Sequence, residues 1–140
     1  MTEGKGTVKK TVSKTVPKSK SKKKIRSVTR GRVYINSTFN NTIVTVTDEK
    51  GEVLSWSSGG VIGFSGTKKG TPLAASKASM DALEKAKKYG LKEVEVYVKG
   101  IGPGKETAVK ALANTGVRVL LLKDANRFPH NGCRPRKRPR

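Results

Sequence analysis

Short stretches rich in β-branched residues predict three strands in the first half of the chain, at residues 33–39, 42–47 and 53–57. The pair Asn40-Asn41 lies between the first two and can take the positive φ that a tight hairpin demands. Residues 48–51 form a second turn, with Gly51 at the position that needs a glycine. Strands joined by such short turns predict an antiparallel meander.

The second half predicts helix, strand, helix and strand in turn, over residues 72–89, 93–99, 105–115 and 117–122. Thr71 is a good N-cap for the first helix, and Pro72 suits its first position. Gly90 and Gly116 end the two helices. The last strand is almost continuously apolar, which is typical of a strand covered on both faces.

The element order β-β-β-α-β-α-β predicts an α/β fold, a single layered domain built on a mixed five-stranded sheet. The last two crossovers are expected to be parallel and right-handed, with one helix on either face of the sheet. We assign this domain to residues 31–124, between an N-terminal arm at residues 1–30 and an extended C-terminal tail at residues 125–140.

Positive charge is concentrated in these two extensions. The chain has 31 Lys and Arg residues against 10 Asp and Glu, a net charge of +21. Of the basic residues, 11 lie in residues 1–30 and 7 in residues 123–140, and each segment has a single acidic residue. Basic arms on a small domain indicate a polyanionic partner, with an affinity that falls steeply with salt. The Lys-rich N-terminal arm is expected to be disordered when free.

Several other classes are disfavoured. The longest aliphatic run, residues 119–122, is too short to cross a membrane, and the N-terminus lacks the apolar segment of a secretion signal. The single cysteine, Cys133, fits a reducing compartment. His130 and Cys133 are too few soft ligands for a zinc site, so we expect neither a metal nor a cofactor.

Residues 59–71 form a long loop with five glycines. Phe64 offers a stacking surface, Lys68 and Lys69 offer charges for phosphates, and Thr71 opens a helix. These features suit irregular RNA, which proteins hold by stacking and backbone contacts. The alternative is an ordinary mobile surface loop.

A second glycine-rich segment, residues 100–105, precedes the second helix. Lys99 and Glu106 occupy places where a Walker loop needs Gly and Ser or Thr, so nucleotide hydrolysis is disfavoured. A tight connection and a phosphate contact at the helix N-terminus are about equally good interpretations. For Asn40-Asn41, ordinary turn chemistry is at least as good an interpretation as contact with RNA.

Other polar residues give no catalytic pattern. His130 lies near the tail with no acid–base partner nearby in the sequence. Acidic residues at 48, 49 and 52, and at 93 and 95, are interpreted as solvated surface rather than a paired, buried set. Trp56 alternates with two serines on a strand and is assigned to the core.

The C-terminal segment, residues 128–140, mixes prolines with arginines, so its cations are held on an extended backbone. Arginine also pairs with phosphate through two hydrogen bonds. Residues 129–135, Pro-His-Asn-Gly-Cys-Arg-Pro, resemble the C-terminal signature of bacterial-type small-subunit ribosomal protein eleven. Further segments agree with that family: Ser37-Thr38-Phe39-Asn40-Asn41-Thr42, Ser55-Trp56-Ser57-Ser58, Lys68-Lys69-Gly70-Thr71-Pro72, and Val98-Lys99-Gly100 with Gly102 and Gly104. The resemblance covers about residues 31–140 and leaves out residues 1–24.

The resemblance implies a structural protein on the platform of the small ribosomal subunit, in a bacterial-type cytoplasmic ribosome, with an organellar ribosome as the alternative. Such proteins bridge rRNA helices and help form the cleft that holds the mRNA leader paired to rRNA. Their neighbours are small-subunit proteins seven and eighteen, with proteins six and twenty-one and an initiation factor close by. The fold is similar to ribonuclease H, but the carboxylate that such nucleases carry on the first strand is absent from residues 33–39. The resemblance therefore implies no enzymatic activity.

The residues expected to contact rRNA are cations, amides, an aromatic ring and glycines of the arms and loops: Lys22, Lys23, Lys24, Arg26, Arg30, Asn40, Asn41, Phe64, Lys68, Lys69, Thr71, Lys99, Gly102, Gly104, Lys105, His130, Asn131, Arg134, Arg136, Lys137, Arg138 and Arg140. The alternative function is a non-ribosomal nucleic-acid chaperone or histone-like binder. The long glycine loop and the Asn-Gly tail argue against it, because a generic DNA binder needs neither. A nuclease ranks third, and membrane binding through the Lys-rich arm ranks fourth.

Overall fold

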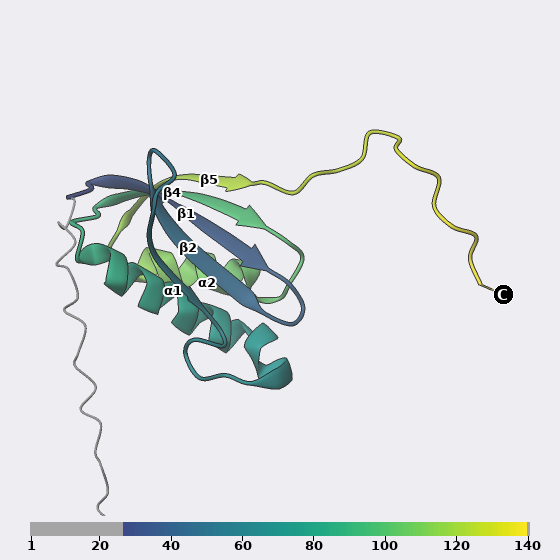
Figure 1. The fold of residues 1–140 in the computed structure, drawn as a ribbon, viewed down its shortest axis with the longest axis horizontal. Helices are drawn as coiled ribbons and strands as arrows, with labels where there is room; N and C mark the ends of the chain where they lie inside the picture. Colours follow the sequence, from purple (N-terminus) through teal and green to yellow (C-terminus); the bar gives the residue numbers. More distant parts are fainter. Residues whose placement is uncertain (1–26, 140) are drawn as a thin grey trace, which may run out of the picture.

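The computed structural model describes residues 27–139. Five strands form one mixed sheet in the order β3-β2-β1-β4-β5 (Figure 1). The elements are β1 Arg30–Ser37, β2 Thr42–Asp48, β3 Val53–Ser58, the 3-10 helix η1 Gly66–Gly70, α1 Pro72–Lys87, β4 Glu93–Lys99, α2 Gly104–Asn114 and β5 Arg118–Asp124. The expected element order and fold class are confirmed, with η1 as an addition inside the glycine loop.

Strand β1 lies at the centre of the sheet. It pairs antiparallel with β2 and parallel with β4, and the outer pairs β2–β3 and β4–β5 are antiparallel and parallel. The meander of the first three strands and the two parallel crossovers of the second half are therefore as predicted.

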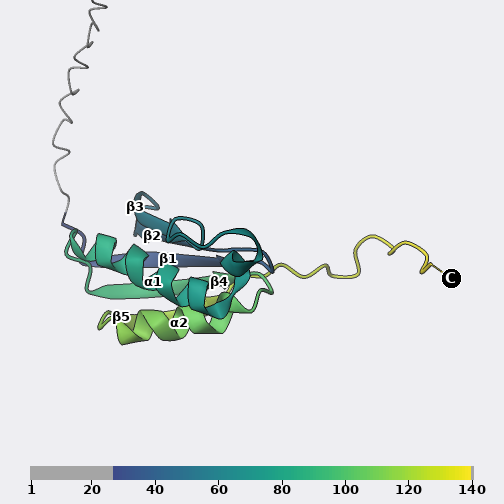
Figure 2. The same ribbon diagram turned by 90° about the horizontal axis from the view of Figure 1, so that it is seen from below.

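Both helices lie on the same face of the sheet, which we call the inner face (Figure 2). Helix α1 packs against α2, β2 and β3, while α2 also contacts β1 and β4. The prediction of one helix on either face was wrong. Strand β3 runs parallel to β4, and the crossovers β3–α1–β4 and β4–α2–β5 advance in the same direction across the sheet. Two right-handed crossovers that advance in one direction place their helices on one face.

The core lies between the inner face and the helices. Its strands contribute valines and one isoleucine at alternate positions, such as Val33 and Ile35 on β1, which are at most 1% exposed. Helix α1 contributes mostly alanines to the core, which let it lie close to the sheet. Ser55 on β3 donates to the backbone oxygen of Ala82 at 2.8 Å and Ser57 donates to Asp81 Oδ2 at 2.6 Å, so these two serines face α1.

Trp56 points the other way, and its assignment to the core was wrong. Its side chain is 54% exposed, because it lies on the face of the sheet opposite the helices, which we call the outer face. Strand β5 also differs from the prediction, since every one of its residues is exposed. It is an edge strand beside β4, and its apolar side chains, such as Leu122 at 57% exposure, are not covered on both faces.

The hairpin between β1 and β2 uses a different turn from the one predicted. Neither Asn40 nor Asn41 has a positive φ, and Asn131 is the only non-glycine residue in the described part of the chain that does. The turn is instead closed by two hydrogen bonds between Thr38 and Asn41. Thr38 N donates to Asn41 O at 2.9 Å, and Asn41 N donates to Thr38 Oγ1 at 3.1 Å. The second turn has Gly51 at φ +93°, as expected.

Residues at the start of the described chain already bond to the domain. Val28 N donates to Tyr89 O at 2.8 Å, and Thr29 O accepts from Lys92 N at 2.9 Å. The predicted disorder of the N-terminal arm concerns residues that lie mostly outside the described range. Among the described helices, none is long and apolar enough to cross a membrane.

We predict that Gly102→Ala lowers the free energy of unfolding by about 1–3 kcal/mol, because an added methyl group overpacks the hairpin. A Cβ on Gly102 would lie 2.2 Å from the backbone oxygen of Thr38. Gly60→Ala is the matched control, since its nearest neighbour would be 3.5 Å away. Its stability should change by less than about 0.5 kcal/mol. Urea unfolding followed by circular dichroism measures both, and equal stabilities would contradict the close contact.

Candidate RNA interface

Three loops and the C-terminal tail meet at one end of the domain, where β1 and β4 end (Figure 1). We call this the loop end: the hairpin tip at residues 37–42, the glycine loop at 59–71, the connection at 100–104 and the tail from residue 125. Both helices also begin here. The candidate residues of the two glycine segments, which are 31 to 41 positions apart in sequence, are thereby brought together.

The glycine loop is packed onto the hairpin tip. A Cβ on Gly70 would lie 2.0 Å from Phe39 O, and one on Gly59 would lie 3.1 Å from Asn41 Oδ1. Inside the loop, η1 carries Lys68 and Lys69 in its last turn. The loop therefore presents these lysines from an ordered turn.

The connection at residues 100–104 is packed onto the other side of the tip. Gly100 has φ +100°, and its Cβ would lie 2.0 Å from Ser37 O. Gly102 N donates to the same oxygen at 3.0 Å, while Gly100 N donates to Asn126 Oδ1 at 2.8 Å and so fastens the start of the tail. Gly102 and Gly104 are buried. Close packing thus accounts for these glycines and favours the interpretation as a tight connection.

Several candidate side chains also have local structural partners. Thr71 caps α1, accepting from Ala74 N at 3.4 Å and donating to Lys68 O at 2.7 Å. Asn41 Oδ1 accepts from Thr42 N at 2.9 Å. Phe64 is half-buried and has the Lys77 Nζ 5.5 Å from its ring centroid. By contrast, the side chains of Asn40, Lys68 and Lys99 are exposed, while Lys69 is half-buried.

Lys105 is held by an acidic partner. Its Nζ lies 2.5 Å from Asp124 Oδ2 at the end of β5. This hydrogen bond, together with one from Asn126 N, lowers the pKa of the Asp124 carboxyl group. Asp124 therefore remains charged and competes with any phosphate for Lys105.

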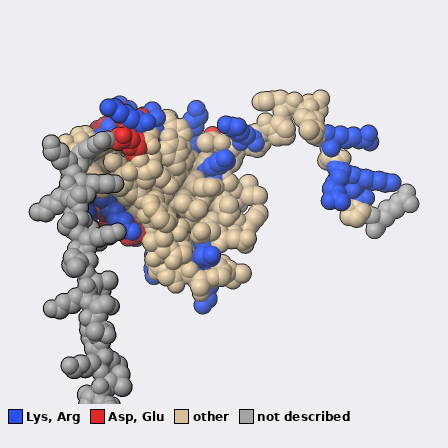
Figure 3. Space-filling model, viewed as in Figure 1, with Lys and Arg blue, Asp and Glu red and all other residues tan. Residues whose placement is uncertain are grey.

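The tail leaves the domain without helix or strand through residue 139, as predicted (Figure 1). His130, Asn131 and the cations Arg134, Arg136, Lys137 and Arg138 are all exposed. Figure 3 shows the basic side chains toward the end of the tail well away from the body of the domain. Lys22, Lys23, Lys24, Arg26 and Arg140 lie outside the described residues.

Arg30 is separated from the other described candidates. It begins β1 at the end of the sheet opposite the loop end and lies 3.8 Å from Glu49 and 3.5 Å from Glu95. The interpretation of Glu95 as solvated surface was wrong, since its side chain is only 19% exposed and also pairs with Arg32 at 3.3 Å. Within the described residues, no group of three or more His, Cys, Asp or Glu side chains could hold a metal ion.

Sequence reasoning missed three exposed apolar residues at or near the loop end: Phe39, Ile101 and Phe128, which are 67%, 74% and 77% exposed. Phe39 had been assigned to the first strand, which ends earlier, at Ser37. The Thr38 hydroxyl group was the available signal, because a threonine three residues before Asn41 can close a turn by itself. Phe39 and Phe128 add aromatic rings, and Ile101 an aliphatic side chain, beside the exposed cations.

A sequence model of the family described as Ribosomal protein S11 matches residues 31–140, most of the chain. The chain belongs to the ribosomal protein S11 family. It is 58% identical to the small ribosomal subunit protein uS11 of a Nitratiruptor species over 116 residues, which cover 82% of this chain and 89% of that protein. Its identity to the protein of the same name from a Sulfurovum species is 56% over 116 residues, covering 82% and 94%.

The uS11 of Nautilia profundicola is also 58% identical, over 82% of this chain and 89% of that protein. These bacterial relatives confirm the resemblance to the bacterial-type S11 family. Ribosomal protein S11 is a structural, non-enzymatic family, which agrees with the prediction that the chain is not an enzyme.

We predict that Asp124→Asn strengthens rRNA binding roughly two- to fivefold, about the worth of one exposed ion pair. The change frees Lys105 while keeping the Oδ1 acceptor for Asn126 N. One more neutralised phosphate should also steepen the slope of log K against log salt by about 0.7–0.9. Filter binding at several salt concentrations measures both quantities.

Glu106→Gln is the matched control, because it removes the same charge from the loop end without releasing a lysine. Glu106 has no ion-pair partner among the described residues. It should give a smaller gain and leave the slope unchanged. The same slope in both variants would show that Lys105 does not reach a phosphate.

Proposed function

We propose that this chain binds and bridges separate rRNA helices on the platform of the small subunit, where it helps form the cleft for the mRNA leader paired to rRNA. As a member of the S11 family, the chain is a structural constituent of the small ribosomal subunit and associates with its rRNA. The observation that carries the proposal is the loop end, which joins a rigid surface to an extended basic tail.

The rigid part is suited to a fixed RNA geometry. Backbone contacts at Gly70, Gly100 and Gly102 hold the loops against the hairpin tip. Exposed Lys68, and Lys99 at the end of β4, face solvent there without an acidic partner among the described residues. Such cations contact phosphates and position the protein, while the exposed Phe39 can stack on an unpaired base.

The tail is suited to a second RNA element. Prolines keep it extended, and its arginines can pair with phosphates through two hydrogen bonds each. Ordering the tail costs conformational entropy, which phosphate pairing and counterion release offset. A rigid surface and a tail that contact different helices would bridge them.

The neighbours and location follow from the family resemblance. We propose contacts with small-subunit proteins seven and eighteen, with proteins six and twenty-one and an initiation factor close by. The chain is located in the ribosome, and the bacterial relatives favour a cytoplasmic ribosome. We further propose that Lys22, Lys23, Lys24 and Arg26 in the N-terminal arm add affinity through diffuse phosphate contacts.

We predict that binding to small-subunit rRNA is steeply salt dependent, because the chain carries a net charge of +21. Neutralising roughly 6–10 phosphates should cost about 10³–10⁵ in affinity between about 50 and 200 mM salt. Filter binding over this range provides the measurement. A flat profile would be incompatible with phosphate contacts by the arms.

We predict different effects for deletion of the two extensions. Deleting residues 129–140 should abolish incorporation into small subunits, because the prolines hold the arginines on an extended backbone that fits one arrangement of phosphates. Deleting residues 1–24 should leave incorporation intact and lower its salt tolerance. Reconstitution of each truncated chain, scored by footprinting of the rRNA, tests this division. A harmless C-terminal deletion, or equal loss of footprints from both, would refute it.

A further inference from the structure

The outer face of the sheet carries a row of aromatic side chains that the loop end does not include. Register places Trp56 opposite Thr45, Thr45 opposite Tyr34, and Tyr34 opposite Tyr97. Lys123 on β5 is next in the row, opposite Tyr97. Residues in register on neighbouring strands project from the same face, so these five side chains cross the whole sheet in one line.

The rings in this row are partly or largely open to solvent. Trp56 is 54% exposed and Tyr34 40%, while Tyr97 is partly exposed. Tyr34 and Tyr97 stack on each other with ring centroids 5.3 Å apart and planes inclined by 20°. Both helices lie on the inner face, so no other element of the described chain covers these rings.

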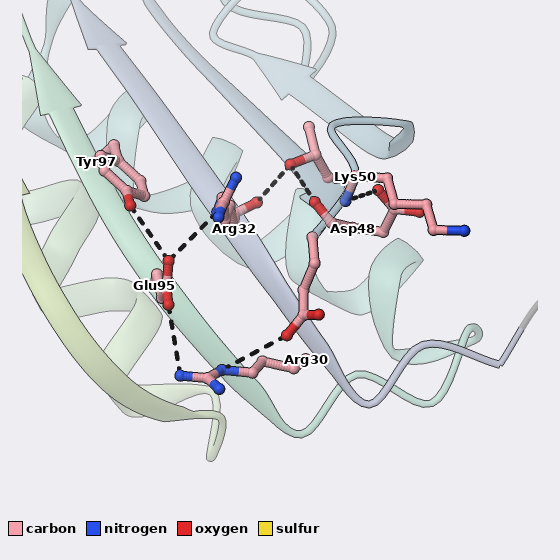
Figure 4. Close-up of polar contacts among 8 residues, drawn as sticks. Arg30, Arg32, Asp48, Lys50, Glu95 and Tyr97 are labelled. Atoms are coloured by element: carbon pink, nitrogen blue, oxygen red, sulfur yellow. Dashed lines mark hydrogen bonds and ion pairs between the residues drawn. The ribbon is translucent and has the colours of Figure 1, made fainter.

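Polar contacts hold Tyr97, one ring of this aromatic row, in place (Figure 4). The Tyr97 hydroxyl group donates to Glu95 Oε2 at 3.2 Å. The same carboxylate accepts from Arg32 Nε at 3.3 Å and, through Oε1, from Arg30 Nη2 at 3.5 Å. Burial, and then the bond to Glu95, raise the pKa of Tyr97, so its ring remains a neutral phenol. The Tyr34–Tyr97 pair is therefore ordered before any ligand arrives.

Charge on the outer face is distributed unevenly along the strands. At the start of β1 and β4, arginines pair with glutamates: Arg30 with Glu49 and Glu95, Arg32 with Glu95, and Arg118 with Glu93. Toward the loop end, Lys99 and Lys123 project from the same face by strand alternation and are exposed. Neither lysine has an acidic partner among the described residues. The unneutralised charge thus lies beside the rings, at the end nearest the RNA interface.

We propose that the outer face is a stacking platform for unpaired rRNA bases, with Trp56 and the Tyr34–Tyr97 pair taking bases and Lys99 and Lys123 taking phosphates. Aromatic rings flanked by cations on an open sheet are a general means of holding single-stranded RNA. The proposal rests on the proposed function, since it extends the same rRNA interface from the loop end across the sheet.

An RNA occupant fits the chemistry of this face better than a protein surface. The cores of protein–protein interfaces are depleted in lysine, whereas two unpaired lysines border these rings. The side chains between and beside the rings, Thr45 and Asn36, are short and polar. Ile43 and Leu121, opposite Asn36 and Glu95, add aliphatic surface to the same face at 41% and 45% exposure. Within the row itself the apolar surface is the ring faces, which every base can use.

Trp56 makes the proposal directly testable, because it is the only tryptophan in the chain. Fluorescence of the full-length protein would be followed during titration with a short oligoadenylate. Stacking of a base should quench the emission of Trp56. Polyphosphate, a polyanion without bases, should bind the arms and lysines without comparable quenching. Anisotropy of labelled oligoadenylate would report binding independently of Trp56.

Two variants separate stacking from a merely structural role. Replacing both Tyr34 and Tyr97 by Leu should weaken oligoadenylate binding about tenfold, the order of one lost stacking contact. The matched control replaces both by Phe, which keeps the rings and removes only the hydroxyl groups, and should bind within about twofold of wild type. Circular dichroism would confirm folding of both. Quenching in the wild-type chain remains an independent measurement if the Leu variant is unstable.

The outcomes distinguish this inference from the function on which it rests. Base-dependent quenching with weakened binding only in the Leu variant would support the platform. Binding by anisotropy with no quenching and equal affinity in both variants would overturn it, and would leave the outer face as a surface for a protein partner. If the wild-type chain binds neither oligoadenylate nor small-subunit rRNA, the proposed function is overturned as well. If it binds the rRNA but not oligoadenylate, only the platform is overturned.

Discussion

The loop end depends on the close packing of three backbone carbonyl groups against three glycines. The oxygens of Ser37, Thr38 and Phe39 lie where a Cβ on Gly100, Gly102 or Gly70 would have to be placed, at 2.0, 2.2 and 2.0 Å. Only glycine permits backbones to come this close. These contacts clamp the hairpin tip between two loops, set where both helices begin, and bring Gly100 within reach of Asn126 at the root of the tail.

Much of this architecture could be predicted from local sequence signals. The bounds of β4 were predicted to the residue, and the Thr71 cap with Pro72 marked the start of α1, because these signals involve only neighbouring residues. Which strand faces are buried could not be predicted in the same way. Trp56 and strand β5 were both assigned to buried positions, yet what covers a strand depends on elements distant in sequence. Which face each helix covers depends on the direction in which the two crossovers advance across the sheet, and that direction is set by the strand order.

The same distinction applies to the candidate interface. Residue types led to the prediction that several segments contact RNA, and the structure brings two of them, residues 59–71 and 100–105, to the same end of the domain. Whether an individual lysine is available could not be predicted, since the Lys105–Asp124 pair joins residues 19 positions apart. The sheet has two unlike faces as a result of its topology: an alanine-rich helical layer on one and an aromatic row on the other. The composition, with only 5% aromatic residues, did not indicate that Trp56, Tyr34 and Tyr97 would lie in one row.

The extended tail also has a consequence for the kinetics of assembly. Residues 125–139 contain no helix or strand, and a chain of that length can reach roughly 50 Å when fully extended. Such a tail enlarges the radius within which the protein can first capture RNA by charge. Once either the loop end or the tail is bound, the other is confined to a small volume around its target, at an effective concentration of the order of millimolar. Two weak attachments of this kind can dissociate singly and rebind, so an incorrectly placed protein can correct its position before both become fixed.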